Sequence, residues 1–343
     1  MRRPAWNPAR RLSDTEIVWD APPPPAKLQV VVDHSRTILA RNQSEDLPFR
    51  WSLNPYRGCT HACAYCYARA FHEYLDLGAG SDFERKIRIK PQAARLLTET
   101  FERPSWVGEG IALSGATDPY QPLERRHGLT RSVLEVCARY RNPVGILTRS
   151  PLVTRDIDLL QALAAHDAVR VHVSIPILDP DLCRLLEPGA PAPARRLDAI
   201  AALHDAGVPV GVSVSPVIPG LNDVTIPATL RAAREAGAVW AWRIPVRLAP
   251  AVEAVFRRRL HEALPLRAER IMAGISRMRG GGPLDGGPPG QRMRGQGEAW
   301  AATARLFDLH AARLGFRPLP PRRTHSPFRR PGRGQQVSLF GGG

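Results

Sequence analysis

Between residues 47 and 248, short apolar runs alternate with segments of helical periodicity, and this alternation constrains the fold more than any other feature. The runs predicted to be buried strands leading into polar loops are GEGIALSGATD, PVGILTRS, AVRVHVSIPI, VPVGVSVSPVI and VWAWRIPV. Strands separated by helices predict βαβ units and a mainly parallel sheet. Together with a strand just before Cys59, about six units fit, fewer than the eight of a closed barrel. We therefore expect an open or partial barrel.

Amphipathic patterns predict which helix faces are buried. In residues 131–140 the shared face is Val133, Val136, Cys137 and Tyr140. In residues 195–206 it is Leu197, Ile200, Ala201 and His204. Near the end of the chain, a last helix carries a stripe of Trp300, Ala304, Phe307, Ala311 and Leu314.

Composition divides the chain into four predicted regions. Residues 1–45 are an extended arm, 46–250 the core barrel, 251–316 a helical region with a Gly/Pro loop at 279–297, and 317–343 a disordered Arg-rich tail. No run of about eighteen apolar residues is present, so no membrane span is expected. The basic N-terminus is not followed by an apolar stretch, so we expect a cytoplasmic protein with reduced thiols.

The net charge of +16 favours a polyanionic partner such as nucleic acid. Of the 48 basic side chains, only Lys27, Lys86 and Lys90 are lysine, and arginine is accompanied by abundant Ala, Pro and Gly. A GC-rich coding sequence would produce the same composition, so the charge leaves both explanations open.

Three of the five cysteines, Cys59, Cys63 and Cys66, lie within eight positions in the spacing C-x3-C-x2-C. This clustering argues for a metal site and against a disulfide framework. Zinc sites usually close with four protein ligands, and His61 inside the loop could serve as the fourth. A cubane iron–sulfur cluster also prefers thiolates, and three of them leave one iron open to a substrate or cofactor. We favour the cluster.

The cysteine loop, placed after the first strand of a parallel βα array with Tyr65 just before the last cysteine, resembles the radical S-adenosylmethionine superfamily. In that family S-adenosylmethionine chelates the fourth iron of a [4Fe-4S] cluster. Reduction then cleaves its sulfonium to a 5′-deoxyadenosyl radical, which abstracts hydrogen from the substrate. The resemblance implies a partial (β/α)6 barrel, here with a small C-terminal helical extension and disordered basic termini.

Within the superfamily, residues 50 to 220 resemble the spore photoproduct lyase group. The matching stretches include CAYCYAR, SGATDPYQPLE, ILTRSPLVTRDIDLL and the segment from VHVSIP through LLEPGAPAPARRLDAIAALHDAGVPVGVSVSPVIPGLND. The resemblance implies cluster ligation by Cys59, Cys63 and Cys66, and places the Tyr65 ring beside adenine. The further cofactor contacts that it implies are Ser114, Gly115, Ala116, Thr117, Arg149, Ser174, Ser215, Pro216 and Val217. Arg149 stands where the lyase has a lysine, and a guanidinium also binds carboxylate.

The chain departs from the lyase at the hydrogen donor. The lyase uses a cysteine after its second strand, and Ala116 stands at the matching position. Tyr67 matches a tyrosine implicated in radical transfer, although an aromatic packed beside the cluster explains it equally well. Cys137 and Cys183 are the other thiols that could replace this donor. Cys137 is predicted to be a buried helix residue, and Cys183 to lie nearer the expected rim of the barrel. Asp118 and Glu124 are candidate polar contacts at the site, either as a carboxylate pair for acid–base work or as loop caps.

These features predict a radical S-adenosylmethionine enzyme, lyase-like and acting in DNA repair, that receives electrons from a donor such as flavodoxin or ferredoxin. One alternative is a non-catalytic iron–sulfur accessory protein that binds nucleic acid or the sliding clamp. Another is a radical enzyme that modifies RNA or protein.

The last residues carry a possible docking peptide. QVSLF, with Gln336, Leu339 and Phe340 at the informative positions, resembles the Q-x-[SD]-L-F peptide that binds the bacterial DNA polymerase sliding clamp. Leu339 and Phe340 would be apolar anchors, and Gln336 would set the register by hydrogen bonds. A chance C-terminal remnant is the alternative.

Replacing both Leu339 and Phe340 by alanine should abolish binding to a purified sliding clamp, because both apolar anchors are removed. Surface plasmon resonance with the full chain measures this. Gln335→Ala, just outside the peptide, is the matched control. Unchanged binding by the double variant would exclude this docking mode.

Overall fold

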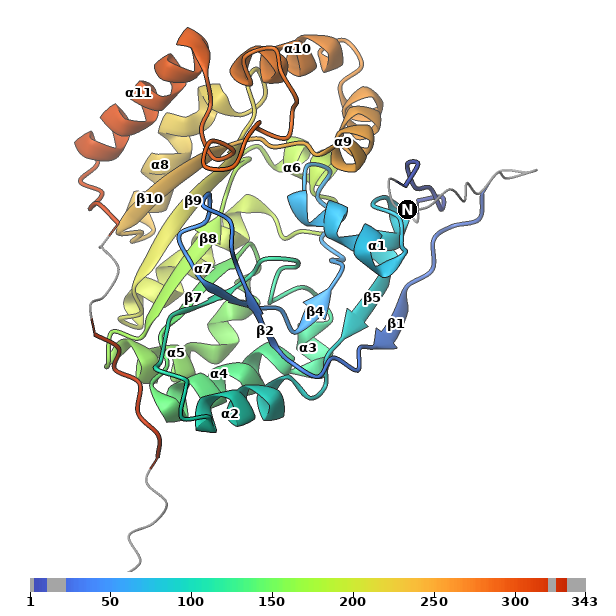
Figure 1. Ribbon diagram of the computed structural model, residues 1–343. Coiled ribbons are helices and arrows are strands. Elements are labelled where there is room, and N and C mark those ends of the chain that lie inside the picture. Colours follow the sequence, from blue (N-terminus) through green and yellow to red (C-terminus); the bar gives the residue numbers. More distant parts are fainter. Residues whose placement is uncertain (1–2, 11–22, 320–324, 332–343) are drawn as a thin grey trace, which may run out of the picture.

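The computed structural model describes residues 3–10, 23–319 and 325–331, and its main feature is a seven-stranded sheet (Figure 1). In spatial order its strands are β10 (Trp240–Pro245), β9 (Val210–Val217), β8 (Val169–Ser174), β7 (Val144–Thr148), β6 (Ile111–Leu113), β3 (Trp51–Leu53) and β2 (Leu39–Arg41). β2 runs antiparallel to β3, and every other neighbouring pair is parallel. Neighbouring strands from β3 to β10 follow one another in the chain, as successive βαβ units require. The predicted partial (β/α)6 barrel is confirmed.

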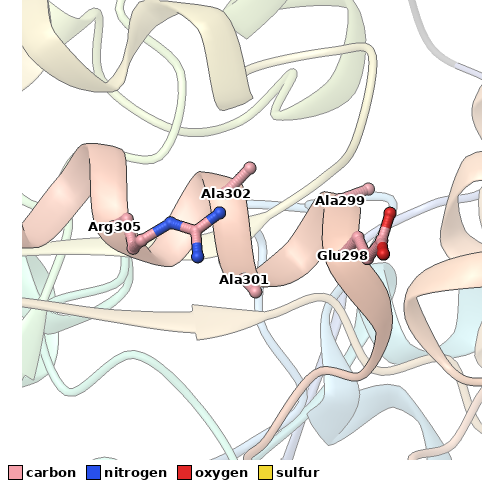
Figure 2. A pocket seen from close by; sticks show the side chains of 5 residues that line it. All are labelled: Glu298, Ala299, Ala301, Ala302 and Arg305. Atoms are coloured by element: carbon pink, nitrogen blue, oxygen red, sulfur yellow. The ribbon is translucent and has the colours of Figure 1, made fainter.

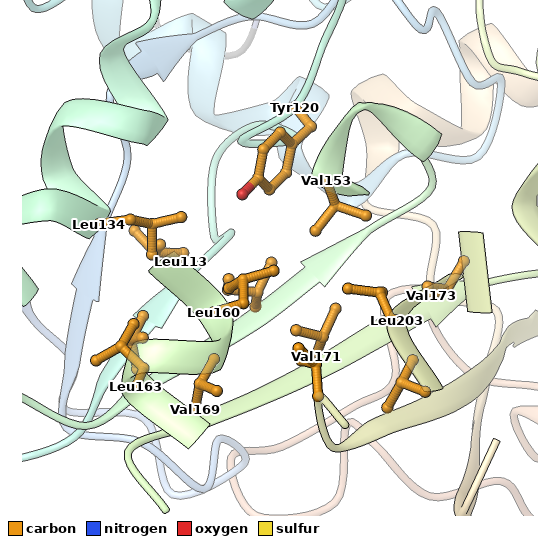
Figure 3. Packing of buried hydrophobic residues seen from close by; sticks show 14 of the residues in the cluster. Leu113, Tyr120, Leu134, Val153, Leu160, Leu163, Val169, Val171, Val173 and Leu203 are labelled. Carbon is orange, nitrogen blue, oxygen red and sulfur yellow. The ribbon is translucent and has the colours of Figure 1, made fainter. Parts of the chain in front are cut away.

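Helices cover the outer face of this sheet. They are α2 (Ala93–Glu102), α4 (Leu129–Tyr140), α5 (Ile157–Ala164), α7 (Pro193–Asp205) and α8 (Ile226–Glu235). Figure 3 shows Val169, Val171 and Val173 of β8 in this layer, near Leu160 of α5 and Leu203 of α7. Because side chains alternate along a strand, the residues between these valines face the inside of the half-barrel. The inner face of β8 therefore carries polar side chains.

Two predicted helix faces had different outcomes. In α4, Val133, Val136, Cys137 and Tyr140 are all buried, as predicted. In α7 the buried residues are Pro193, Arg196, Ala199, Ile200 and Leu203. Of the predicted α7 face only Ile200 is buried, so that prediction was wrong. The face is rotated because the Arg196 side chain points inward to an ion pair with Glu187.

The C-terminal helices form a second layer of packing. α6 (Pro180–Leu186), α9 (Pro250–Ala263) and α10 (Ala268–Met278) share an apolar cluster with residues of the cysteine loop. α11 (Gly297–Arg313) packs on α8 and buries Phe307, while Trp300, Ala311 and Leu314 contact the main core. Among the described residues, no helix has the length and apolar character needed to cross a bilayer.

The remaining elements are shorter. A three-stranded sheet has the order β1 (Gln29–Val32), β5 (Lys86–Ile89) and β4 (Tyr56–Arg57). The remaining helical segments are α1 (Ser81–Arg85), α3 (Glu124–His127) and the 3₁₀ helices η1 (Tyr67–Leu75), η2 (Pro151–Asp156) and η3 (Asp223–Thr225). The N-terminal arm reaches α1, where the Trp6 amide donates to Ser81 Oγ at 2.9 Å.

The C-terminal tail differs in part from its predicted disorder. In residues 325–331, the Phe328 ring packs against Phe101 and Tyr140, with ring centroids 5.6 and 6.1 Å away. The Arg330 guanidinium donates to the carbonyls of Phe101, Arg103 and Trp106. Aromatic packing and three carbonyl acceptors therefore hold this segment, which the sequence composition did not indicate.

The Gly/Pro loop after α10 joins the two sides of the half-barrel. Arg279 donates to the Val246 carbonyl just after β10 at 2.6 Å, and to the Arg294 carbonyl of the loop at 2.7 Å. The Arg292 amide in turn donates to Asp46 Oδ1, in the turn between β2 and β3, at 2.9 Å. These hydrogen bonds link the β10 edge of the sheet to the β2 edge.

Asn222 ties together the loops that leave β8 and β9. Its Nδ2 donates to the Pro176 carbonyl at 2.7 Å and to the Pro216 carbonyl at 2.9 Å, while its Oδ1 accepts from the Ile218 amide at 2.7 Å. The side chain is 2% exposed, so water cannot replace these partners.

Asn222→Ala should lower the free energy of unfolding by about 2–4 kcal/mol, because buried backbone groups lose their partners. Urea denaturation followed by circular dichroism measures the change. Val224→Ala, at a neighbouring side chain that is 78% exposed, should stay within about 0.5 kcal/mol of the parent. Equal losses in the two variants would contradict this role for Asn222.

Candidate functional site

Cys59, Cys63 and Cys66 lie in a tight loop between β4 and η1. All three are free thiols, and Cys59 and Cys63 are buried. The Ala62 amide donates to the Cys59 carbonyl, and the Cys66 amide donates to the Cys63 carbonyl, both at 3.3 Å. Ala62 has a φ of 56°, in the left-handed region that a side chain disfavours. The loop is thus a strained backbone turn that surrounding contacts must hold.

The segment after α6 supplies several of those contacts. The Ala64 amide donates to the Leu186 carbonyl at 2.8 Å, and the Gly189 amide donates to the His61 carbonyl at 3.0 Å. A Cβ atom at Gly189 would lie 2.0 Å from the Thr60 carbonyl oxygen, so only glycine fits there. The LEPGAP stretch found in the sequence therefore packs directly on the cysteine loop.

The loop after β6 holds the start of the cysteine loop. Thr117 Oγ1 donates to the Gly58 carbonyl at 2.7 Å, and Gln121 Nε2 donates to the same carbonyl at 3.1 Å. Gln121 Oε1 accepts from the Thr60 amide at 3.2 Å. Thr117 and Gln121 are both buried, so these hydrogen bonds fix the loop in a dry environment.

Asn54, just beyond β3, shapes the loop that contains the predicted cofactor contacts. Its Oδ1 accepts from the Gly115 amide at 2.9 Å and from the Ala116 amide at 2.8 Å. Ser114, at the start of this loop, has a φ of 123°, which is unusual for a residue with a side chain. Such strain often accompanies functional loops, and here a neighbouring strand end maintains it.

Arg149 lies at the centre of the site. Its Nη1 is 2.7 Å from Cys63 Sγ, 3.2 Å from Glu187 Oε1 and 3.4 Å from the Tyr65 hydroxyl. The Tyr65 hydroxyl donates to Glu187, which also pairs with Arg196. Arg149 is therefore both an electrostatic partner of a cysteine and part of a buried ion-pair network.

Asp118 and His61 form a buried charge pair beside Cys59. Asp118 accepts hydrogen bonds from Thr148 Oγ1 at 2.6 Å and from the Arg149 amide at 2.9 Å. Its Oδ2 is 3.4 Å from His61 Nδ1. Burial raises the pKa of Asp118, but His61 and these donors lower it more, to about 2. Burial lowers the pKa of His61, but Cys59 and Asp118 raise it to about 9.

The environment of the thiols fits iron ligation. Burial raises the pKa of Cys63 well above its ordinary value, and Arg149 offsets only part of that. Burial and the neighbouring Cys59 raise the pKa of Cys66. The pKa of Cys59 is lowered, because His61 outweighs its burial. The three thiols are close enough to affect one another's pKa. Binding of cations to the thiolates would offset the unfavourable burial of their negative charges.

No three Cys, His, Asp or Glu side chains within the described ranges gather as the ligands of one metal ion do. The thiolates of a cubane cluster bind separate irons, so they need not converge on one point. Three thiols in one strained loop, two of them buried and with cationic side chains beside them, therefore fit the [4Fe-4S] cluster that the sequence favoured.

The other predicted contacts line the same end of the sheet. Tyr67 follows Cys66 directly, and its hydroxyl interacts with Ser114. Ser174, at the end of β8, donates from Oγ to the Ser215 carbonyl at 3.4 Å. Pro216 and Val217 contribute mainly backbone carbonyls, which accept from Asn222 and Val246. The fold thus brings the predicted strand-end residues to the carboxyl ends of parallel strands, where open α/β sheets place their sites.

Other sequence candidates have structural partners. Glu124 is buried, accepts from the Tyr56 hydroxyl at 2.5 Å and pairs with Arg155 at 2.7 Å, so it is not the partner of Asp118. Cys137 lies inside α4, and Cys183 lies in α6 against Arg196. Gln336, Leu339 and Phe340 lie outside the described residues.

Three residues that organise the site were missed from sequence: Asn54, Gln121 and Glu187. Each is a single polar residue whose partners lie far along the chain, so no local pattern marks it. Gln121 and Glu187 do fall within the SGATDPYQPLE and LLEPGAP stretches, which were the only available signal.

Two surface cavities lie apart from this site. One of about 530 Å³ is on the outer face of α11, and Figure 2 shows its lining residues Glu298, Ala299, Ala301, Ala302 and Arg305. The other, of about 710 Å³, lies between β10 and α11 and includes Trp242 and Trp300. Neither is lined by a residue of the predicted site.

A family model for the Radical SAM superfamily matches residues 53–233, which include all three clustered cysteines. The chain belongs to the radical SAM superfamily. The resemblance drawn from the cysteine loop and the βα pattern is therefore confirmed at the family level.

Among sequence relatives, an uncharacterized protein of Mycobacterium tuberculosis is 44% identical over 177 residues, which are 52% of this chain and 52% of the relative. The chain thus matches about half the length of that relative. A protein of Pseudomonas phage M6 named radical SAM Nalpha-GlyT isomerase is 29% identical over 169 residues, 49% of this chain and 33% of the relative.

Solved structures of spore photoproduct lyase variants share the fold. One gives a TM-score of 0.56 at 14% identity, covering 83% of this chain and 78% of the lyase. Another gives 0.53 at 16% identity, covering 68% and 67%. At these identities the likeness concerns the fold alone.

Replacing Cys59, Cys63 or Cys66 singly by alanine should remove most of the visible iron–sulfur absorbance after anaerobic reconstitution with iron and sulfide, because each supplies one thiolate. Bound iron and sulfide per chain measure the loss. Cys137→Ala removes a buried thiol of α4 and should leave the iron content unchanged. Full iron content in all three loop variants would show that the cluster is bound elsewhere.

Proposed function

We propose that the protein is a radical S-adenosylmethionine enzyme that binds a [4Fe-4S] cluster on Cys59, Cys63 and Cys66 and acts on nucleic acid in a lyase-like DNA-repair reaction. The observation that carries the proposal is the strained loop of three thiols, two of them buried, at the carboxyl ends of the barrel strands, beside Arg149 and the Ser114 loop. When bound, the cluster and an electron donor such as flavodoxin or ferredoxin supply reductive cleavage of S-adenosylmethionine to a hydrogen-abstracting radical.

The chain's own residues would position the cofactor. Cys59, Cys63 and Cys66 would each ligate one iron of the cluster, which would leave the fourth iron free to bind the cofactor. The Asn54 side chain holds the Gly115 and Ala116 amides together, so this loop keeps one shape. Ser174 and Ser215 carry hydroxyls on neighbouring strand ends and can orient polar groups of the cofactor.

Arg149 has a more complex role than binding the cofactor carboxylate alone. Its guanidinium already faces Glu187 at 3.2 Å, so that carboxylate neutralises much of its charge. A second carboxylate would share the guanidinium with Glu187 in a planar arrangement, which arginine supports better than lysine. This offers a physical reason for arginine at this position.

The nucleic-acid assignment draws support from the lyase resemblance and from the +16 charge of the chain. The reaction must differ from that of the lyase in its hydrogen donor, because Ala116 has no thiol. Cys137 and Cys183 are buried in α4 and α6, each away from solvent. We propose Tyr67, which is 46% exposed and follows Cys66, as the residue that exchanges a hydrogen atom with the substrate.

The test is anaerobic turnover. Reconstituted protein is reduced with dithionite, given S-adenosylmethionine, and assayed for 5′-deoxyadenosine alone, with DNA and with RNA. Product should form in the parent and in Cys137→Ala, and should fall to the level of a protein-free blank in Cys63→Ala. Stimulation by DNA is the expected result.

Other outcomes would redirect the proposal. Stimulation by RNA alone would point to an RNA-modifying enzyme. A full cluster with no 5′-deoxyadenosine under any condition would overturn the enzymatic function and favour an accessory protein that binds nucleic acid or the clamp.

A further inference from the structure

The 3₁₀ helix η1, which follows the cysteine loop, exposes a row of aromatic rings. Tyr67, Phe71 and Tyr74 are 46%, 44% and 75% exposed. The Tyr67 and Phe71 rings touch edge to face with centroids 6.1 Å apart. Phe71 and Tyr74 are three residues apart, which places them on the same side of a 3₁₀ helix. We call these three residues the aromatic face.

The aromatic face is held rigidly. On the opposite side of η1, the buried Arg69 donates to the Cys63 carbonyl at 2.9 Å and to Glu84 at 2.6 Å. His72 is also buried, and its ring meets Phe83 edge to face with centroids 5.5 Å apart. These contacts hold the backbone of η1 in place, so the three exposed rings project from an anchored helix.

Positive charge lies beside the end of the aromatic face that meets the site. Arg247 is close enough to Tyr67 for their charges to interact, and Arg292 is a like-charged neighbour of Arg247. Among the described residues, neither arginine forms an ion pair with a carboxylate. Arg247 instead donates from Nε to the Asp285 carbonyl at 2.6 Å, and Arg292 to the Gly287 carbonyl at 3.1 Å.

The neighbouring Arg279 adds to this charge. Its guanidinium is surrounded by carbonyl oxygens, and burial together with Arg247 lowers its pKa to about 10. Arg247 has like-charged neighbours in Arg292 and Arg279, against the two nearby acids Asp285 and Asp46, and this excess of positive charge favours binding of an anion.

We propose that the aromatic face, together with Arg247 and Arg292, binds single-stranded nucleic acid and leads it to the site at Tyr67. Bases would stack on Phe71 and Tyr74, and phosphates would pair with the two arginines. Stacking of this kind needs bases whose faces are free, so a single strand fits the surface better than a duplex. The inference rests on the proposed function only in identifying the bound strand with the substrate.

The rings and the charges also argue for one occupant. An apolar peptide would use the rings but leave the arginines without an anionic partner, and an acidic peptide would use the arginines alone. A nucleotide strand carries both a stacking surface and a phosphate at every residue. A nucleotide strand therefore supplies partners for both the aromatic face and the two arginines.

Binding to the full-length reconstituted protein tests the proposal. Fluorescein-labelled 15-mers of mixed sequence, as single-stranded DNA, single-stranded RNA and duplex DNA, are titrated anaerobically and followed by anisotropy. The Phe71→Ala/Tyr74→Ala double variant should bind single strands about tenfold or more weakly than the parent. Leu266→Ala, at a fully exposed apolar side chain between α9 and α10, should bind like the parent.

A charge variant gives an independent readout. Arg247→Gln should weaken binding and reduce the slope of log affinity against log salt by about one, because one phosphate contact is lost. Arg313→Gln, at the exposed end of α11, is the control and should leave the slope unchanged. Tighter binding of DNA or of RNA identifies which strand is used, and either supports the surface.

Several results would overturn the inference. They are unchanged binding in the aromatic double variant, equal affinity for duplex and single strand, and a salt slope unaffected by Arg247→Gln. Formation of 5′-deoxyadenosine without polymer is measured in the same preparations. If 5′-deoxyadenosine still forms but the binding measurements contradict the prediction, only the proposed binding surface is wrong. If no 5′-deoxyadenosine forms but binding follows the prediction, only the proposed radical chemistry is wrong.

Discussion

The buried carboxylate of Glu187 is the interaction on which the organisation of the site depends. It pairs with both Arg149 and Arg196 and accepts a hydrogen bond from Tyr65. Two guanidiniums this close would repel each other without an anion between them, and buried charges persist only when paired. Through these partners one side chain connects the end of β7, helices α6 and α7, and the cysteine loop.

Around this ion-pair network, polar side chains hold a backbone that would not keep its shape alone. Ala62 and Ser114 both have positive φ values, and each costs free energy of the order of 1 kcal/mol or more. Asn54 and Gln121 offset that cost with hydrogen bonds to loop amides and carbonyls. The outer face of the sheet is a conventional apolar core, so stability and function are separated between the two faces.

The sequence allowed the parallel sheet, the α4 face and the position of the cysteine loop to be predicted, because each depends on local periodicity or spacing. It did not predict the buried face of α7, since Arg196 points inward to a carboxylate that local hydrophobicity does not reveal. Glu187 lies 122 residues from Tyr65 and Gln121 lies 61 residues from Thr60, so only the folded chain shows these partnerships. The order in residues 325–331 likewise depends on Phe101 and Tyr140, far away in sequence.

The hydrogen bond between Arg292 and Asp46 has a consequence for how the chain matures. Its two ends are 246 residues apart, so it cannot form until most of the polypeptide has left the ribosome. Contacts this remote are also slow to form, because a long intervening loop must first be ordered. During synthesis the β10 edge and the β2 edge are therefore not yet joined. The half-barrel is therefore completed along this side only after the Gly/Pro loop at 279–297 has been synthesised.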